Sequence, residues 1–180
     1  RHSSAASDVY KRQEERVQHL QKMPIAKGGS LEVLATDVLD SSDVNALLDG
    51  CTDLIHTAAT VMIRSSNPEE KILSPSVDGT MNVVSALELH PSIRNIIHTS
   101  STAAIRPMKW ENGTTLSSEV WAEDATIENN PYGLAKVLAE REIRKWHTDV
   151  GSNQGRTLKT IHPCMVFGPP LSSYHLRGSL

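Results

Sequence analysis

From residue 14 onward the chain alternates short apolar runs with longer amphipathic stretches. Four runs of five residues, rich in apolar and β-branched side chains and bounded by turn-forming residues, predict strands at 31–35, 53–57, 95–99 and 158–162. Helical patterns separate these runs, which favours βαβ units over hairpins.

Helices are predicted in the intervening stretches. A charged segment at 14–23 has helix-forming composition. Ser41 or Ser42 is placed to cap a short helix at 41–48, and a longer helix is expected at 76–89. The predicted core-facing positions are Val44, Leu47 and Leu48 in the short helix, and Val77, Met81, Val84 and either Leu87 or Leu89 in the longer one.

This alternation predicts an α/β fold with a parallel sheet and right-handed crossovers. Ligands of such sheets bind beyond the carboxyl ends of the strands. The polar stretch 106–129 has no clean period, and its length predicts a functional loop near that edge. The residues expected at the strand ends are Asp37, Ala58, Ala59, Thr99, Ser100, Ser101, Pro163, Cys164, Met165 and Val166.

A tyrosine and a lysine four residues apart open a further helix, which is expected to run to about Trp146. Asn130 can cap this helix and Pro131 suits its first turn, so Tyr132 and Lys136 should share one face. A free phenol loses its proton near pH ~10, and a neighbouring cation favours the phenolate. The pair therefore suits proton transfer, although an ordinary surface pair would look the same in sequence.

The composition of the chain limits the classes of ligand and partner that it is expected to bind. A net charge of −3 and a pI near 6.2 give no reason to expect nucleic acid or an anionic membrane. No stretch approaches the ~20 apolar residues of a membrane span and no signal peptide is visible, so a cytoplasmic location is expected. Cys51 and Cys164 are expected to be reduced thiols that only pack, and the eight histidines are scattered singly, so no metal is predicted.

Six motifs occur in order between residues 14 and 170. They are Leu-Ala-Thr-Asp-Val-Leu-Asp (34–40), Leu-Ile-His-Thr-Ala-Ala (54–59), Val-Asp-Gly-Thr-Met-Asn-Val-Val (77–84), Ile-Ile-His-Thr-Ser-Ser (96–101), Tyr132-xxx-Lys136 and His-Pro-Cys-Met-Val-Phe-Gly-Pro (162–169). Together they resemble the extended short-chain dehydrogenase/reductase superfamily, in its NAD-dependent epimerase/dehydratase branch. Glu119-Val120-Trp121 and Val-Phe-Gly-Pro are most similar to dihydroflavonol, cinnamoyl-CoA and fungal ketone reductases. The resemblance implies a Rossmann-like, doubly wound sheet.

The resemblance also implies a catalytic set. Tyr132 would be the general acid that protonates a carbonyl as hydride arrives, or the base in the reverse direction. Lys136 would hold the nicotinamide ribose hydroxyls and favour the phenolate. Ser101 would hydrogen-bond the substrate oxygen.

The implied cofactor is NADP or NAD, with NADP favoured by analogy. Asp37 would accept from the adenine amino group, although by itself it equally suits a helix or turn cap. Thr99 and Ser100 also suit a purely structural role. The implied cofactor-binding positions are Asp37, Val38, Ala58, Ala59, Thr99, Tyr132, Lys136, Pro163, Met165 and Val166.

Departures from the family pattern set the expected boundaries. The glycine-rich loop G-x-x-G-x-x-G and the strand before it do not occur, and Ser76 stands where relatives often carry asparagine. Residues 1–13 are expected to be a non-native leader, 14–170 a partial NAD(P)-binding domain and 171–180 the start of a substrate-binding region. We expect such a fragment, on its own, to be marginally stable and not to bind NAD(P) measurably.

The resulting prediction is an NAD(P)-dependent oxidoreductase that interconverts a small-molecule ketone or aldehyde and an alcohol. A sugar-nucleotide epimerase or dehydratase, a sterol dehydrogenase and a non-catalytic nucleotide-binding relative remain alternatives. Retention of Ser101, Tyr132 and Lys136 argues against the non-catalytic alternative. The sequence leaves the oligomeric state open.

Overall fold

The computed structural model describes residues 17–169 and Leu171. The described residues divide into two units, 17–35 with 166–169 and Leu171, and 36–165. In the first unit residues 17–21 are helical, as predicted. The predictions for residues 1–13 and, apart from Leu171, for 171–180 lie outside the described residues.

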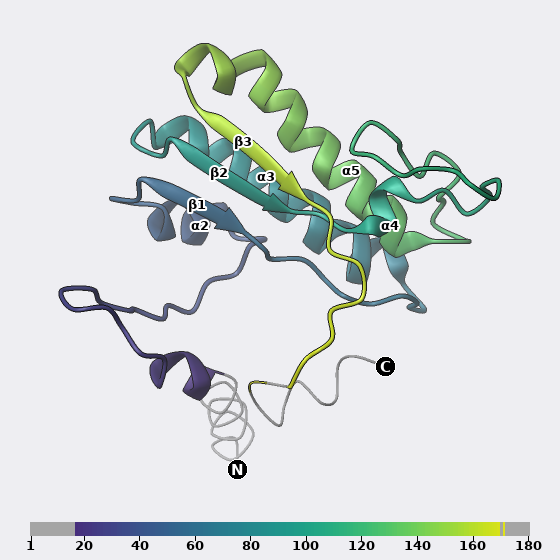
Figure 1. The fold of residues 1–180 in the computed structure, drawn as a ribbon. Coiled ribbons are helices and arrows are strands. Elements are labelled where there is room, and N and C mark those ends of the chain that lie inside the picture. Colours follow the sequence, from purple (N-terminus) through teal and green to yellow (C-terminus); the bar gives the residue numbers. More distant parts are fainter. Residues whose placement is uncertain (1–16, 170, 172–180) are drawn as a thin grey trace. The chain divides into compact units, whose positions relative to one another are not determined.

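Three parallel strands form the sheet of the second unit (Figure 1). They are β1 (Asp53–His56), β2 (Asn95–Thr99) and β3 (Thr157–Ile161), in the order β1-β2-β3. His56 pairs with His98, and His98 with Thr160, so the strands are in register at their carboxyl ends. Parallel pairing across helical connections confirms the predicted α/β fold.

The strand predicted at 31–35 is wrong. These residues have no regular secondary structure, and Leu31, Val33 and Leu34 are exposed. No described strand pairs with them. Because strand propensity is weak until a neighbour satisfies the backbone N–H and C=O groups, the apolar pattern alone is not enough.

Helices cover one face of the sheet in the described residues, with α2, α3 and α5 lying behind β1, β2 and β3 in the view of Figure 1. The helical elements are α2 (Ser41–Leu47), the π-helical turn η1 (Glu69–Leu73), α3 (Ser74–Leu89), α4 (Thr102–Ile105), α5 (Pro131–Trp146), the π-helical turn η2 (His147–Gly151) and the 3-10 turn η3 (Ser152–Gln154). No described helix is long and apolar enough to cross a membrane. This is one side of a doubly wound arrangement.

The core lies between these helices and the sheet. Leu87 of α3, Ile96 of β2 and Ile143 of α5 have no exposed surface and pack in one cluster with Val44 of α2. Each fully buried side chain of this size stabilises the fold by about 1.5–3 kcal/mol. The core therefore anchors α5 to the strand whose carboxyl end leads to Ser101.

The predicted cap of α2 is wrong by one residue. Asp40 caps the helix, because its carboxylate accepts from the amides of Ser42 (2.8 Å) and Asp43 (3.2 Å). A carboxylate at this position also complements the positive end of the helix. Ser41 is the first helical residue, and Leu47, predicted to face the core, is exposed.

The predicted core stripe of α3 is rotated relative to the observed one. Of the predicted residues Leu87 is buried, Val77 and Val84 are half-buried, and Met81 and Leu89 are exposed. The buried face carries Ser76, Gly79, Thr80, Val83, Ala86 and Leu87. Small residues occupy this face because the segment at Val38 packs closely against α3. A Cβ on Gly79 would lie 3.0 Å from Cγ2 of Val38.

Candidate functional site

The carboxyl ends of the three strands meet at one edge of the sheet, where the predicted site residues follow them. Beyond the strands, the amide of Ser100 donates to the carbonyl of Ile161 at 2.9 Å, and the amide of Thr102 donates to the carbonyl of Pro163 at 3.0 Å. These bonds continue the β2–β3 pairing past the strand ends. They hold Ser101 between two fixed backbone positions.

Ser101 caps the short helix α4. Its Oγ accepts from the amide of Ala103 at 3.1 Å, and the residue is nearly buried. Because a hydroxyl has one donor and two acceptor sites, this cap leaves the hydroxyl proton available for a ligand oxygen. Ala104 and Ile105 of α4 share an apolar cluster with Val137 of α5. This cluster joins residues 100–102, called here the Ser101 segment, to the helix that carries Tyr132.

The start of α5 follows the prediction. Asn130 caps the helix, since its side-chain oxygen accepts from the amide of Gly133 at 3.0 Å, and Pro131 occupies the first turn. Tyr132 is half-buried in that turn, and Lys136 follows one turn later. The two residues therefore lie on one side of α5.

Lys136 is buried, which excludes the alternative of a surface pair. Its side chain is 5% exposed, and Nζ donates to the carbonyl of Thr99 at 3.1 Å. Burial lowers the pKa of Lys136, and the nearby carboxylate of Glu140 opposes that shift. An ammonium has three donors, so two remain beyond the bond to Thr99.

Asp37 lies after the non-strand segment 31–35 and is exposed. Its carboxylate accepts from the amide of Leu39 at 2.9 Å, so the structure shows the turn cap that was the alternative reading. Val38 is half-buried, and its carbonyl accepts from Nδ2 of Asn82 on α3 at 2.9 Å. The backbone here is thus fixed against α3.

The remaining predicted residues are less enclosed. Ala58 is exposed and Ala59 half-buried in the irregular segment after β1. Met165 is exposed, and Val166 belongs to the other unit, so its place relative to the edge is not described. Within the described residues, Oγ1 of Thr99 is buried without a hydrogen-bond partner.

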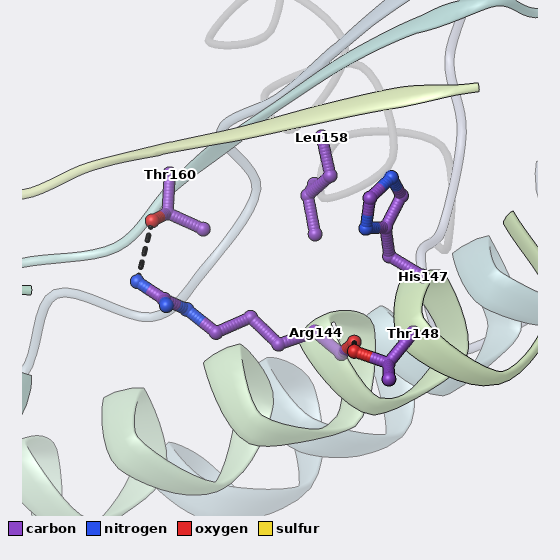
Figure 2. A pocket seen from close by; sticks show the side chains of 5 residues that line it. All are labelled: Arg144, His147, Thr148, Leu158 and Thr160. Carbon is purple, nitrogen blue, oxygen red and sulfur yellow. Dashed lines mark hydrogen bonds between the residues drawn. The ribbon is translucent and has the colours of Figure 1, made fainter. Parts of the chain in front are cut away.

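Sequence reasoning missed a buried ionic group on α5. Glu140 has no exposed side-chain surface and contacts Arg144 on the same helix and His162 after β3. Arg144 also donates to Oγ1 of Thr160 at 2.8 Å (Figure 2). That bond bounds a pocket of about 240 Å³ lined by Arg144, His147, Thr148, Leu158 and Thr160. The sequence held a signal for this group, because Glu140 follows Lys136 by one helical turn and so lies on the same side of α5.

It also missed a pair of buried histidines. The rings of His56 and His98 lie 5.3 Å apart, and neither nitrogen of His98 has a hydrogen-bond partner among the described residues. Nε2 of His56 lies 3.1 Å from Oγ1 of Thr80. Adjacent strands in register bring together histidines that look isolated in sequence.

The donors at this edge fit the nicotinamide-ribose end of a dinucleotide. Lys136 offers two ammonium protons, while Ser101 and Tyr132 offer hydroxyls, and ribose hydroxyls and a carbonyl oxygen accept such bonds. The described residues hold no cluster of three His, Cys, Asp or Glu side chains that could bind a metal ion. What the described edge offers a ligand is hydroxyl and ammonium donors.

Comparisons with known proteins find reductases among the relatives of this chain. Tetraketide alpha-pyrone reductase 1 of Arabidopsis thaliana is 30% identical over 161 residues, covering 88% of this chain and 48% of the relative. Cinnamoyl-CoA reductase CAD2 of Medicago truncatula is 29% identical over 160 residues, covering 87% and 48%. The chain thus spans about half the length of the curated relatives it matches.

Solved structures show the same fold. The yeast methylglyoxal/isovaleraldehyde reductase Gre2, solved in complex with NADPH, superposes with a TM-score of 0.71 at 23% identity, covering 88% of this chain and 49% of the other. The sheet and helices are therefore part of a Rossmann-like α/β fold. Residues 6–176 match the 3-beta hydroxysteroid dehydrogenase/isomerase family, and the chain belongs to this family, within the extended short-chain dehydrogenase/reductase superfamily that its motifs predicted.

Proposed function

We propose that the chain carries the catalytic edge of an NADP- or NAD-dependent oxidoreductase that interconverts a ketone or aldehyde and an alcohol. The observation that carries this proposal is the buried Lys136, fixed on Thr99 one helical turn after Tyr132. The reductases among the relatives support it, as does the NADPH complex of Gre2. NADP is favoured over NAD on that similarity.

The nicotinamide ring, when bound, supplies hydride to the carbonyl carbon. The phenol of Tyr132 gives its proton to the carbonyl oxygen, which becomes the alcohol. Ser101 donates its hydroxyl proton in a hydrogen bond to the same oxygen, since its cap bond uses it only as an acceptor. Lys136 donates to the ribose hydroxyls and stabilises the phenolate left on Tyr132.

Other strand-end residues are proposed to border the cofactor. Asp37 accepts from the adenine amino group with its second carboxylate oxygen, Val38 lies alongside, and Ala58 and Ala59 admit the adenosine to the backbone. Pro163 and Met165 border the nicotinamide, near Thr99, and Val166 follows them in the chain. Ala58 and Ala59 follow β1 and Pro163 follows β3, and such folds bind dinucleotides beyond the carboxyl ends of parallel strands. Asp37 and Val38 follow no described strand, and their proposed role is supported by the resemblance of residues 34–40 to the family motif.

A second candidate is the oxidation of a sterol alcohol, which the description of the matching family favours. The chemistry of Tyr132 would run in reverse, with the phenolate accepting the alcohol proton. A substrate panel separates the two functions: aromatic aldehydes and ketones with NADPH against a 3β-hydroxysteroid with NAD. The substrate with the higher kcat/KM decides between them.

Tyr132→Phe tests the proposal in the longest expressed product that contains this chain. Loss of the phenol should lower kcat by about 10²-fold or more, because a positioned general acid contributes on that scale. NADPH affinity, measured by fluorescence, should stay within about 3-fold, since the ring still packs. Ser101→Ala removes the proposed hydrogen bond to the substrate oxygen and should also lower kcat. Its control is Ser118→Ala, which removes an exposed hydroxyl from the stretch 106–129 and should leave kcat unchanged. Activity of Tyr132→Phe within a few-fold of the parent would contradict the proposal.

A further inference from the structure

A fully buried carboxylate lies one helical turn beyond Lys136. Glu140 of α5 has no exposed surface, although the proposed reaction gives it no part. Burying an ionised carboxylate costs several kcal/mol unless cations and hydrogen bonds replace the lost water. Its partners therefore indicate what it does.

Two side chains contact the carboxylate of Glu140. Nε of Arg144, on the same helix, donates to Oε1 at 2.8 Å. Nε2 of His162 lies 3.0 Å from Oε1 and 2.9 Å from Oε2. Since an ionised carboxylate only accepts, Nε2 of His162 carries a proton. Glu140 thus links α5 to the first residue after β3.

His162 stands between the two backbone positions that flank the Ser101 segment. The carbonyl before it, on Ile161, accepts from Ser100, and the carbonyl after it, on Pro163, accepts from Thr102. The stretch 161–163 is held to the Ser101 segment by its main chain and to α5 by the side chain of His162. Ser101 and Tyr132 come from different elements, and this link joins those elements.

We propose that Glu140 and His162 form a positioning pair that holds the Ser101 segment and the Tyr132–Lys136 helix in register for reaction. The inference rests on the proposed function and deepens it. Neither residue is required to touch the substrate. A misplacement of about 1 Å between reacting groups can cost about 10²-fold in rate, so such a link affects catalysis well beyond its effect on stability.

The same carboxylate stabilises the charge on Lys136. Glu140 raises the pKa of Lys136 against the larger lowering caused by burial. The titratable groups that face this region from the sheet are His56 of β1 and His98 of β2, with pKa values of about 4 and about 3, and both are neutral at pH 7. Arg144 and His162 contact Glu140 itself. Removing the charge of Glu140 therefore favours the neutral amine of Lys136.

The first test needs no activity. Amide hydrogen exchange at Ser100 and Thr102 is measured in the 180-residue chain by NMR. His162→Leu removes the donor and should speed exchange at both amides by about 10-fold or more, whereas His162→Gln keeps an N–H donor and should restore protection. Glu123→Gln is the matched control, because it breaks an exposed ion pair with Arg141 of α5. Parental protection in His162→Leu would overturn the positioning role.

The second test uses Glu140→Gln, which keeps the shape of the side chain. The NMR titration of Lys136 through its ¹³Cε shift should move to lower pH in this variant. The alkaline limb of the pH-rate profile should move the same way in the longest expressed product. An unchanged titration of Lys136 would overturn the electrostatic part. Should His162→Leu fail to fold, amide exchange in Glu140→Met, which removes both acceptor oxygens, tests the link instead, and parental protection there overturns it.

Kinetics separate this inference from the proposed function. His162→Leu should lower kcat by about 10- to 100-fold with the KM for NADPH within about 3-fold, and His162→Gln should recover most of the rate. If Tyr132→Phe stays active, the proposed function is refuted. Amide hydrogen exchange and the titration of Lys136 still test whether Glu140 and His162 link the two elements. If Tyr132→Phe is inactive but His162→Leu has the parental kcat, the positioning role of Glu140 and His162 is refuted and the proposed function stands.

Discussion

Two buried histidines should make the fold sensitive to acid. His56 and His98 are 5% and 2% exposed. Burial, and then the charge of Lys136, lowers the pKa of His56 from 6.5 to about 4. Burial, followed by His56 and Lys136, lowers the pKa of His98 from 6.5 to about 3. At pH 5 both rings are therefore neutral in the folded chain, whereas the unfolded chain binds a proton on each.

The sign follows from linkage. Because the folded pKa values are depressed, the stability contributed by the neutral rings is complete above pH ~6.5 and is lost as pH falls towards the folded pKa values. Between pH 8 and pH 5 each histidine should remove about 2 kcal/mol, so the pair removes about 4 kcal/mol. A typical domain has a net stability of about 5 to 15 kcal/mol, so this loss is a large fraction of the total.

His98→Leu isolates one of the two rings, since neither of its nitrogens has a partner to lose among the described residues. Urea unfolding of the 180-residue chain between pH 5 and pH 8 should show a loss of stability smaller by about 2 kcal/mol in this variant. Ile96→Val, on the same face of β2, is the control and should lower stability by about 0.5–1.5 kcal/mol equally at every pH. Equal pH dependence in His98→Leu and the parent would refute the reasoning.

Two further substitutions address α5. Lys136→Met should weaken NADPH affinity by about 10-fold or more and also lower kcat, because the ribose hydroxyls lose a charged donor. A cofactor titration and initial rates, measured on one protein preparation, test this. Unchanged values in both would show that Lys136 is not part of the site. Asn130→Ala should lower the stability of the chain by about 1 kcal/mol through loss of the cap bond to Gly133, as a thermal melt would record, and an unchanged melting temperature would show that the cap is dispensable.

Local sequence signals predicted much of the fold. The strands at 53–57, 95–99 and 158–162 correspond to β1, β2 and β3, and Asn130 and Pro131 start α5 as expected. These predictions depend on neighbours in sequence, such as caps and short apolar runs. The strand at 31–35 failed because a ladder requires a partner, which periodicity within one segment cannot reveal.

The details of the site depend on contacts between distant segments. The buried face of α3 differs from the predicted one because Val38, 41 residues earlier in the chain, packs closely against Gly79. Helical periodicity within α3 cannot show this contact, so it predicted that the larger side chains would be buried. Glu140 resembled a surface residue because Arg144 follows it at ion-pair spacing on the helix. Only the return of the chain through His162 shows that the carboxylate is buried.

The main-chain bonds around Ser101 join strands that are made at different times during synthesis. Asn95 of β2 and its neighbour Thr157 of β3 lie 62 residues apart in the chain, and α5 is made between them. Closing so long a loop is entropically costly before the new strand contacts are gained. During synthesis, β1, β2 and α3 can therefore associate before the acceptors for Ser100 and Thr102 have left the ribosome. β3 is the last of the three described strands to be made, and the main-chain bonds that hold the segment around Ser101 form only when it docks.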